Sequence, residues 1–165
     1  MVRLLRPLAI AANITQSSFC RIDDVLITFG YLIMHYSAMD DHEDQVGRDS
    51  ILASIERRWA KADQEIFIAA VILNPFYQST PFARLSFLTN AGIHAMLERL
   101  WIRFEGSTSR EPVPPEFHNQ VSQYLARSGH FEGLQKQCEI AQLSADREVR
   151  SFSMLCQSHP YELCC

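Results

Sequence analysis

The densest group of side chains that could do chemistry is the acidic run Asp40-Asp41-His42-Glu43-Asp44. Two-metal phosphoryl transfer uses carboxylates that separate strands or helices bring together around divalent ions. Adjacent residues cannot all point to one ion, and this run follows a predicted helix and is closed by Gly47. We therefore interpret it as a solvated acidic turn, and we predict no catalytic residue and no metal site.

Cysteine and histidine are the other candidate metal ligands. Near the end of the chain, Cys156 and His159 have the spacing Cys-x-x-His, and Cys164 and Cys165 are adjacent. A structural zinc site needs four ligands, and neighbouring cysteines rarely hold one ion without strain. The six histidines are dispersed, without the i, i+4 pairing of helical metal sites. We predict no cofactor, and the odd number of scattered cysteines favours a reducing compartment.

Motifs for nucleophilic catalysis are also missing from the sequence. The six glycines form neither a Gly-x-Ser-x-Gly elbow nor a phosphate-binding loop. Cys20, at the edge of a predicted helix, is most simply a packing residue. The sequence therefore predicts that this chain is not an enzyme.

Two tryptophans that stand among arginines are the best candidates for contact with nucleic acid. A tryptophan ring can stack on an unpaired base, and arginine forks bind phosphate. Both tryptophans also lie on apolar helical stripes, so they fit a packed core, and the arginines fit a solvated helix face. The candidate residues are Arg57, Arg58, Trp59, Arg99, Trp101 and Arg103.

Composition limits the class of protein. The chain has 165 residues, of which 47% are apolar, enough for one domain that buries roughly 70% of its unfolded surface. Its net charge of −4 argues against a free-standing, strongly basic DNA-binding module, although 13 of its 15 cationic residues are arginine. The longest apolar run, residues 66–73, is far too short to cross a membrane, so we expect no membrane contact.

The clearest helical pattern covers residues 19–36. Asp23 and Thr28 fall outside its apolar face, and Gly30 within it costs about 1 kcal/mol against alanine, so packing must hold the helix there. The apolar residues recur at steps of three and four. They are Phe19, Ile22, Val25, Leu26, Phe29, Leu32, Ile33 and Tyr36.

Shorter helical patterns follow. A helix with apolar positions from 51 to 59 is expected to start behind Asp49 and Ser50, which are good N-caps. Residues 66–73 predict a short, very apolar helix, the most buried element, that Asn74-Pro75 stops. Another stripe, at residues 93–104, is expected to be capped by Asn90.

Residues 106–115, GSTSREPVPP, contain one glycine and three prolines and predict a surface loop or a hinge. Beyond them, a helix with apolar residues from 117 to 125 is expected to end with Gly129 at its C′ position. No strand alternation persists anywhere. The fold class is therefore all-α, an irregular multi-helix bundle, with one helical domain at residues 1–150 and a separate tail at 151–165.

One resemblance adds to this interpretation. The string SIERRWAKADQEIFIAAVILNPF, at residues 54–76, resembles a segment of hAT-superfamily transposases in which a charged-Arg-Trp unit precedes an apolar helix that ends in Asn-Pro. Residues 7–32 and 120–134 resemble the helical regions around it in copies that are common in mushroom-forming fungi. The likeness covers roughly residues 5–150, and Arg58-Trp59 with Asn74-Pro75 are its landmarks.

The resemblance implies a relation to the large all-helical insertion that splits the ribonuclease H-like catalytic domain of that family. The family's three catalytic acidic residues and its zinc-finger DNA-binding domain have no counterpart here. Its Cys/Asp-x-x-His motif is also missing, since Met39 stands three residues before His42, and from Ser151 the sequence departs from the family. We therefore expect a non-catalytic fragment or domesticated relative of an hAT transposase.

Two kinds of partner fit such a chain. One is DNA, with a role in scaffolding around transposon ends, which implies a nuclear location. The alternative is a stand-alone helical interaction module, or a non-functional relic, which implies the cytoplasm. An insertion region without its catalytic core should leave apolar helix faces uncovered, so a homodimer or a transposase-related protein is the expected partner of those faces.

Overall fold

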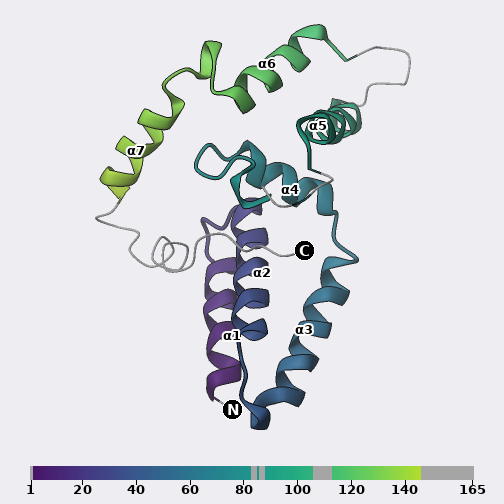
Figure 1. Ribbon diagram of the computed structural model, residues 1–165, viewed down its shortest axis with the longest axis vertical. Coiled ribbons are helices and arrows are strands. Elements are labelled where there is room, and N and C mark those ends of the chain that lie inside the picture. The colour runs from purple at the N-terminus through teal and green to yellow at the C-terminus, as the bar shows by residue number, and fades with distance from the viewer. Residues whose placement is uncertain (1, 83–84, 86–87, 106–112, 146–165) are drawn as a thin grey trace. The chain divides into compact units, whose positions relative to one another are not determined.

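The computed structural model describes residues 2–82, 85, 88–105 and 113–145. These residues form α-helices and short 3-10 helices and contain no strand, which confirms the all-α fold class (Figure 1). None of their helices is long and apolar enough to cross a membrane. The helices are α1 (Val2–Thr15), α2 (Ile22–Ser37), η1 (His42–Asp44), α3 (Gln45–Trp59), α4 (Gln64–Leu73), η2 (Thr80–Phe82), α5 (Asn90–Glu105), α6 (Pro115–Ala126), η3 (Gly129–Phe131) and α7 (Leu134–Ala145).

The chain divides into two compact units, with the boundary inside α4 between Val71 and Ile72. We call the described residues before this boundary unit 1 and those after it unit 2. The sequence carries no sign of the boundary, because it falls within a continuous helix and not in a linker. The expected tail at residues 151–165 lies outside the described residues.

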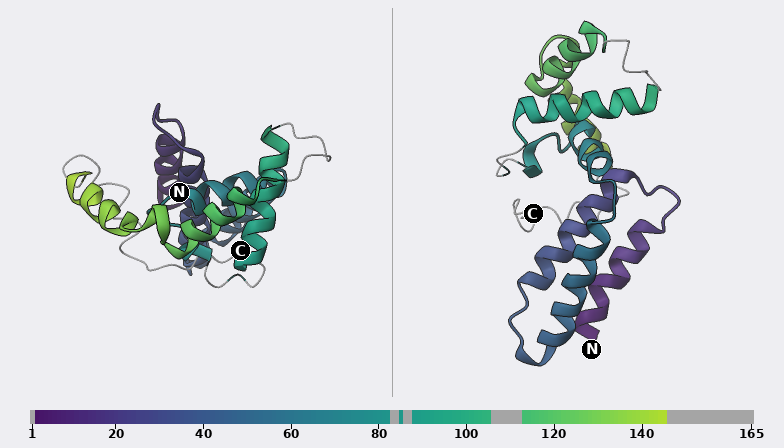
Figure 2. Two further views of the ribbon diagram at one scale, coloured as in Figure 1. Left: turned by 90° about the horizontal axis from the view of Figure 1, so that it is seen from above. Right: turned by 90° about the vertical axis from the view of Figure 1, so that its right-hand side faces the viewer.

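Unit 1 is built on three helices, α1, α2 and α3, which lie side by side in Figure 1 and in the right-hand view of Figure 2. Its innermost residues are Ala11 of α1, Leu32 and Tyr36 of α2, and Ile55 of α3. The hydroxyl of Tyr36 donates a hydrogen bond of 2.5 Å to the backbone oxygen of Leu4, which joins α2 to α1. A fully buried tyrosine needs such a partner, so this bond fixes how the two helices pack.

Helix α2 differs from the predicted amphipathic helix at its start and in its buried faces. It begins at Ile22, and Phe19 precedes it with 88% of its surface exposed. Asp23 and Thr28, outside the predicted face, are only 4% and 2% exposed. Because α1 and α3 both pack against α2, more than one of its faces is buried. Arg21 binds the Asp23 carboxylate through two hydrogen bonds, of 3.0 and 2.8 Å, which offsets the cost of its burial.

Helix α3 starts several residues earlier than the sequence predicted. It follows η1 directly and begins at Gln45, so neither Asp49 nor Ser50 is an N-cap. The hydroxyl of Ser50 donates a hydrogen bond of 2.8 Å to the backbone oxygen of Val46, as a serine inside a helix does. The apolar pattern missed the first turn, since Val46 is its one apolar side chain and is 80% exposed.

Helix α4 ends at Leu73, before Asn74-Pro75, as predicted. The prediction that this helix is the most buried element is wrong: Ala69, Val71 and Ile72 are buried, but Leu73 is exposed and the other residues of 66–73 are only partly buried, whereas α2 has more buried residues. The side-chain oxygen of Asn74 accepts a hydrogen bond of 3.0 Å from the backbone nitrogen of Phe76. This bond shapes the turn after the helix.

The core of unit 2 lies between α5 and α6. Four residues of α5 are buried at the predicted spacing, and Val121 and Tyr124 of α6 are buried as well. The cap of α5 is not the predicted Asn90, which is already the first residue of the helix. Thr89 caps it, because its hydroxyl accepts a hydrogen bond of 3.1 Å from the backbone nitrogen of Gly92. The four buried residues are Ile93, Met96, Leu97 and Leu100.

Helix α6 corrects two predictions at its ends. Pro115, assigned to the loop at residues 106–115, is the first residue of the helix, where proline fits because its missing N–H needs no partner there. Residues 106–112 lie outside the described residues. At the other end, the left-handed residue that closes α6 is Arg127, with φ of 51°, and not Gly129. Gly129 begins η3 and also has a positive φ, of 57°.

Candidate functional site

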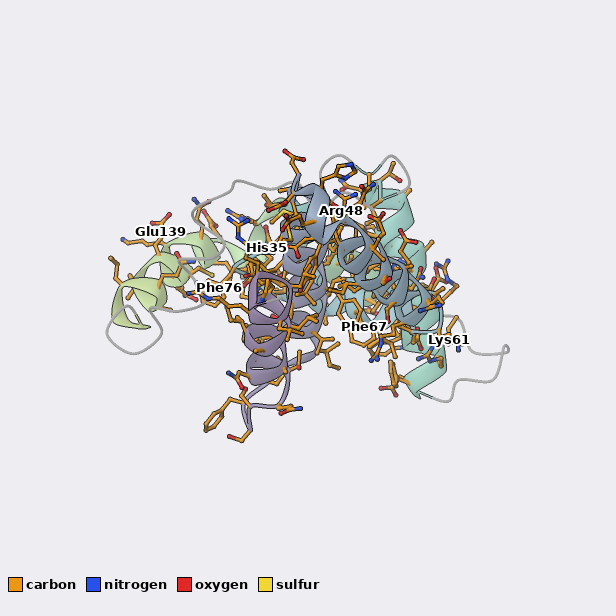
Figure 3. The ribbon with its side chains drawn as sticks, turned by 90° about the horizontal axis from the view of Figure 1, so that it is seen from below. His35, Arg48, Lys61, Phe67, Phe76 and Glu139 are labelled. Atoms are coloured by element: carbon orange, nitrogen blue, oxygen red, sulfur yellow. The ribbon has the colours of Figure 1, made fainter. Side chains whose placement is uncertain are left out.

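The first predicted group, Arg57 and Arg58, lies in the last turn of α3. Both side chains are exposed, as is that of Lys61, which follows the helix and is labelled in Figure 3. Within the described residues, none of these three side chains makes a hydrogen bond or an ion pair. The C-terminal end of a helix carries a partial negative charge, which stabilises basic side chains nearby without any side-chain partner. Their charges are therefore available to an anion.

Trp59, the aromatic residue of the first group, is part of an aromatic row inside unit 1. Its ring lies 6.4 Å from that of Phe29 of α2 and 6.1 Å from that of Phe67 of α4, which Figure 3 labels. The side chain is half-buried. This placement supports the packing interpretation of Trp59, and its stacking on a base stays a prediction.

The second predicted group, Arg99, Trp101 and Arg103, lies on α5 in unit 2. Both arginines are exposed, and Trp101 is 37% exposed with its ring 5.1 Å from that of Phe117 of α6. Phe104, which was not predicted as a site residue, is 69% exposed. The guanidinium carbon of Arg103 lies 5.3 Å from the centre of the Phe104 ring, within reach of a cation–π contact.

Helix α5 thus ends in an exposed aromatic turn, which we define as Trp101, Ile102, Arg103 and Phe104. Phe104 continues the apolar stripe of α5 beyond Leu100, the last residue of that stripe to be buried. Aromatic residues and arginine are the types enriched at the centres of protein interfaces, and they also stack on bases. The turn has the chemistry of a contact surface.

Comparison with protein-family models, with curated proteins and with solved structures finds no match for this chain. The resemblance to hAT transposases therefore rests on the sequence landmarks alone and stays a prediction. Arg58-Trp59 form the end of α3, in unit 1, and Asn74-Pro75 follow the end of α4, in unit 2, so both landmarks stand at helix ends.

The acidic run at residues 40–44 occupies the turn between α2 and α3. Asp41 forms an ion pair of 3.0 Å with Arg3, and its second carboxylate oxygen accepts a hydrogen bond of 3.3 Å from the backbone nitrogen of Glu43. The run is largely exposed. In the part of the chain that the structure describes, no three His, Cys, Asp or Glu side chains are grouped closely enough to hold a metal ion. These carboxylates therefore order a turn.

A pair of histidines escaped the sequence analysis. His94 of α5 and His118 of α6 have ring centres 6.0 Å apart and planes inclined by 28°. The Nε2 of His94 lies 3.2 Å from the hydroxyl oxygen of Ser122, one turn after His118. Because 24 residues separate the two histidines in sequence, only the packing of α5 on α6 brings them together.

A polar network was also missed. Gln78, 5% exposed, donates a hydrogen bond of 3.3 Å from its Nε2 to the backbone oxygen of Tyr124 and accepts one of 2.8 Å from the Nε of Arg127. The hydroxyl of Tyr124 donates to the backbone oxygen of Ile72 at 3.0 Å. Burial raises the pKa of Tyr124 to about 12. The network holds the turn after α4 against the end of α6.

Cys20 is a poor nucleophile. Burial, together with the carboxylates of Asp24 and Asp23, raises the pKa of the Cys20 thiol above its usual range. The thiol therefore stays protonated at neutral pH, and the thiolate is the reactive form. Cys156, His159 and the final cysteine pair lie outside the described residues.

Proposed function

We propose that this chain is a non-catalytic helical relative of the hAT transposase insertion region and that it contacts the phosphate backbone of DNA. The contact surface would be the basic end of α3, which we define as Arg57, Arg58 and Lys61. The observation that carries the proposal is that all three side chains are exposed and have no intramolecular partner among the described residues. Three such cations attract the phosphate backbone of DNA whatever its base sequence.

This role needs no strand cleavage by the chain. The carboxylates of residues 40–44 are engaged in the turn before α3 or point to solvent, and they support its structure. The net charge of −4 predicts that binding is weak at physiological salt and that it increases at low salt. A DNA-contacting chain would act in the nucleus.

The dependence of DNA binding on salt tests the proposal. Fluorescence anisotropy of labelled duplex, hairpin and single-stranded oligonucleotides would be measured over a range of salt concentrations. We expect the double variant Arg57→Ala/Arg58→Ala to weaken binding and to lower the slope of log K against log salt by about 1.5–2.

Arg3→Ala/Arg6→Ala is the control, because it removes the same charge from the exposed side of α1 in the same unit, where Arg3 is already paired with Asp41. It should lower the slope by less than half as much. The proposal fails if the two double variants have equal slopes, or if the unaltered chain binds none of the oligonucleotides at low salt.

The exposed aromatic turn of α5 favours a second candidate function, a helical module that binds another protein. Trp101 and Phe104 are of the aromatic residue types that are enriched at protein interfaces. If this function is correct, Trp101→Ser/Phe104→Ser abolishes self-association or partner binding in analytical ultracentrifugation, while the chain stays folded by circular dichroism. A chain that is monomeric at all concentrations, with no protein partner, would exclude it. Such a module would act in the cytoplasm.

A further inference from the structure

We infer that His94 and His118 form a two-histidine site for a late first-row divalent cation, Ni²⁺ or Zn²⁺, that links α5 to α6. The imidazole nitrogen is a preferred ligand of these ions, whereas Mg²⁺ and Ca²⁺ require oxygen ligands. The pair supplies nitrogen ligands only. The class of metal ion that the pair would bind therefore follows from its donor atoms.

The distance between the rings fits such a site. An ion held tetrahedrally at about 2.0–2.1 Å from two imidazole nitrogens places the ring centres about 5 Å apart. The observed separation is 6.0 Å. Binding of an ion would therefore require the two rings to approach by about 1 Å and to turn their nitrogens toward it.

The Nε2 of His94 faces α6, because it lies 3.2 Å from the hydroxyl of Ser122, one turn after His118. An ion bound at this nitrogen would replace Ser122 as its partner. Both rings are partly accessible to solvent, which gives an ion a way in. Glu98 lies four residues after His94 on α5, so its negative charge favours a cation nearby without being a ligand.

Water would complete the coordination. Among the described residues, no third His, Cys, Asp or Glu joins the pair in a possible metal cluster. A site with two protein ligands and open positions holds its ion reversibly, and the bound ion stabilises the fold by mass action. The ion would tie the two helices that form the core of unit 2.

Paramagnetic Ni²⁺ and nuclear magnetic resonance of the histidine rings test this inference on the full chain. At substoichiometric Ni²⁺, the ring signals of His94 and His118 should broaden together and before that of His130, an exposed histidine of η3. His94→Gln should weaken the broadening of His118 by about tenfold or more, because one of two ligands is lost. His118→Gln should do the same to His94, and His130→Gln should change neither.

This readout separates the site from the cysteines near the end of the chain, because binding there leaves the two rings unaffected. Circular dichroism of each variant establishes that it folds, and glutamine retains a polar group of similar size beside Ser122. The inference is overturned if both rings broaden no earlier than His130. It is also overturned if the response of each ring is unchanged when the other histidine is replaced, since the two would then act as separate surface groups.

Discussion

Arg127 donates a hydrogen bond of 2.8 Å from its Nε to the Oε1 of Gln78, and both residues have a left-handed backbone, with φ of 51° and 50°. They are the only residues other than glycine with positive φ in the part of the chain that the structure describes. Each costs roughly 1–2 kcal/mol of backbone strain. The bond between them, together with the bond from Gln78 to the backbone oxygen of Tyr124, holds both conformations in place.

Two substitutions of Gln78 distinguish the cost of its backbone strain from the contribution of its hydrogen bonds to stability. Gln78→Ala removes both bonds and keeps the strain, so we expect it to lower the free energy of unfolding by about 2–3 kcal/mol. Gln78→Gly removes the same bonds and relieves the strain, so its cost should be smaller by about 1 kcal/mol. Urea denaturation followed by far-ultraviolet circular dichroism measures both. Equal costs for the two variants would show that the backbone of residue 78 is unstrained.

Gly129 and Gly133 form a matched pair, with φ of 57° and 79°. A Cβ on Gly133 would meet no atom within 4 Å, so Gly133→Ala should cost only the backbone strain of about 1 kcal/mol. A Cβ on Gly129 would approach the side-chain carbonyl carbon of Gln123 to 2.7 Å. Since that side chain is held by a hydrogen bond of 3.2 Å to Asn119, Gly129→Ala should cost about 2 kcal/mol.

The double variant Gly129→Ala/Gln123→Ala tests the cause of that difference. Shortening Gln123 removes the clash, so the alanine at position 129 should cost only about 1 kcal/mol when measured against Gln123→Ala alone. A cost that is unchanged in the shortened background would mean that the amide of Gln123 moves aside freely.

We predict that Trp59 stabilises the fold through its packing. Trp59→Ala leaves the rings of Phe29 and Phe67 without the one between them and should cost about 2–3 kcal/mol, reduced from the value for a full core residue by its partial exposure. Trp59→Phe keeps an aromatic ring there and should cost about half as much. Thermal unfolding measures both. If Trp59→Ala unfolds like the unaltered chain but binds single-stranded DNA less tightly, the packing interpretation is wrong.

The all-α fold class and the approximate positions of the helices could be predicted from the sequence, because apolar residues at steps of three and four form one face of a helix and do not fit a strand. The periodicity of residues 93–100 matches the buried face of α5, and Asn74-Pro75 marks the end of α4. Helix starts were less predictable. The first turns of α2 and α3 carry polar residues. At the start of α2 the Asp24 carboxylate accepts a hydrogen bond of 3.0 Å from the backbone nitrogen of Arg21, and α3 follows η1 directly.

The candidate sites were predictable only where they are local in sequence. Arg57 and Arg58 are neighbours, and their exposure follows from their place on a helix. The contact of His94 with His118, and that of Gln78 with Arg127, joins residues 24 and 49 positions apart. Such contacts arise from the packing of helices against one another, which no spacing rule along a single helix encodes.

Tyr124 links alkaline pH to the stability of unit 2. Burial raises its pKa from the ordinary 10.0 to about 12 in the folded chain. Below pH 10 the phenol is protonated in the folded and unfolded states, so its contribution to stability is fully present. Between pH 10 and about 12 only the unfolded state loses the proton, so the free energy of unfolding should fall by about 1.4 kcal/mol per pH unit.

Urea denaturation of the unaltered chain and of Tyr124→Phe at several alkaline pH values distinguishes the effect of Tyr124 from that of the other tyrosines. The variant lacks the hydrogen bond to the backbone oxygen of Ile72, so it should be less stable by about 1 kcal/mol at neutral pH. Its stability should then fall less steeply above pH 10, because the group whose pKa changes on folding is gone. Because burial also raises the pKa of Tyr36, some slope should remain in the variant. Parallel curves for the two chains would show that the phenol of Tyr124 reaches water without unfolding.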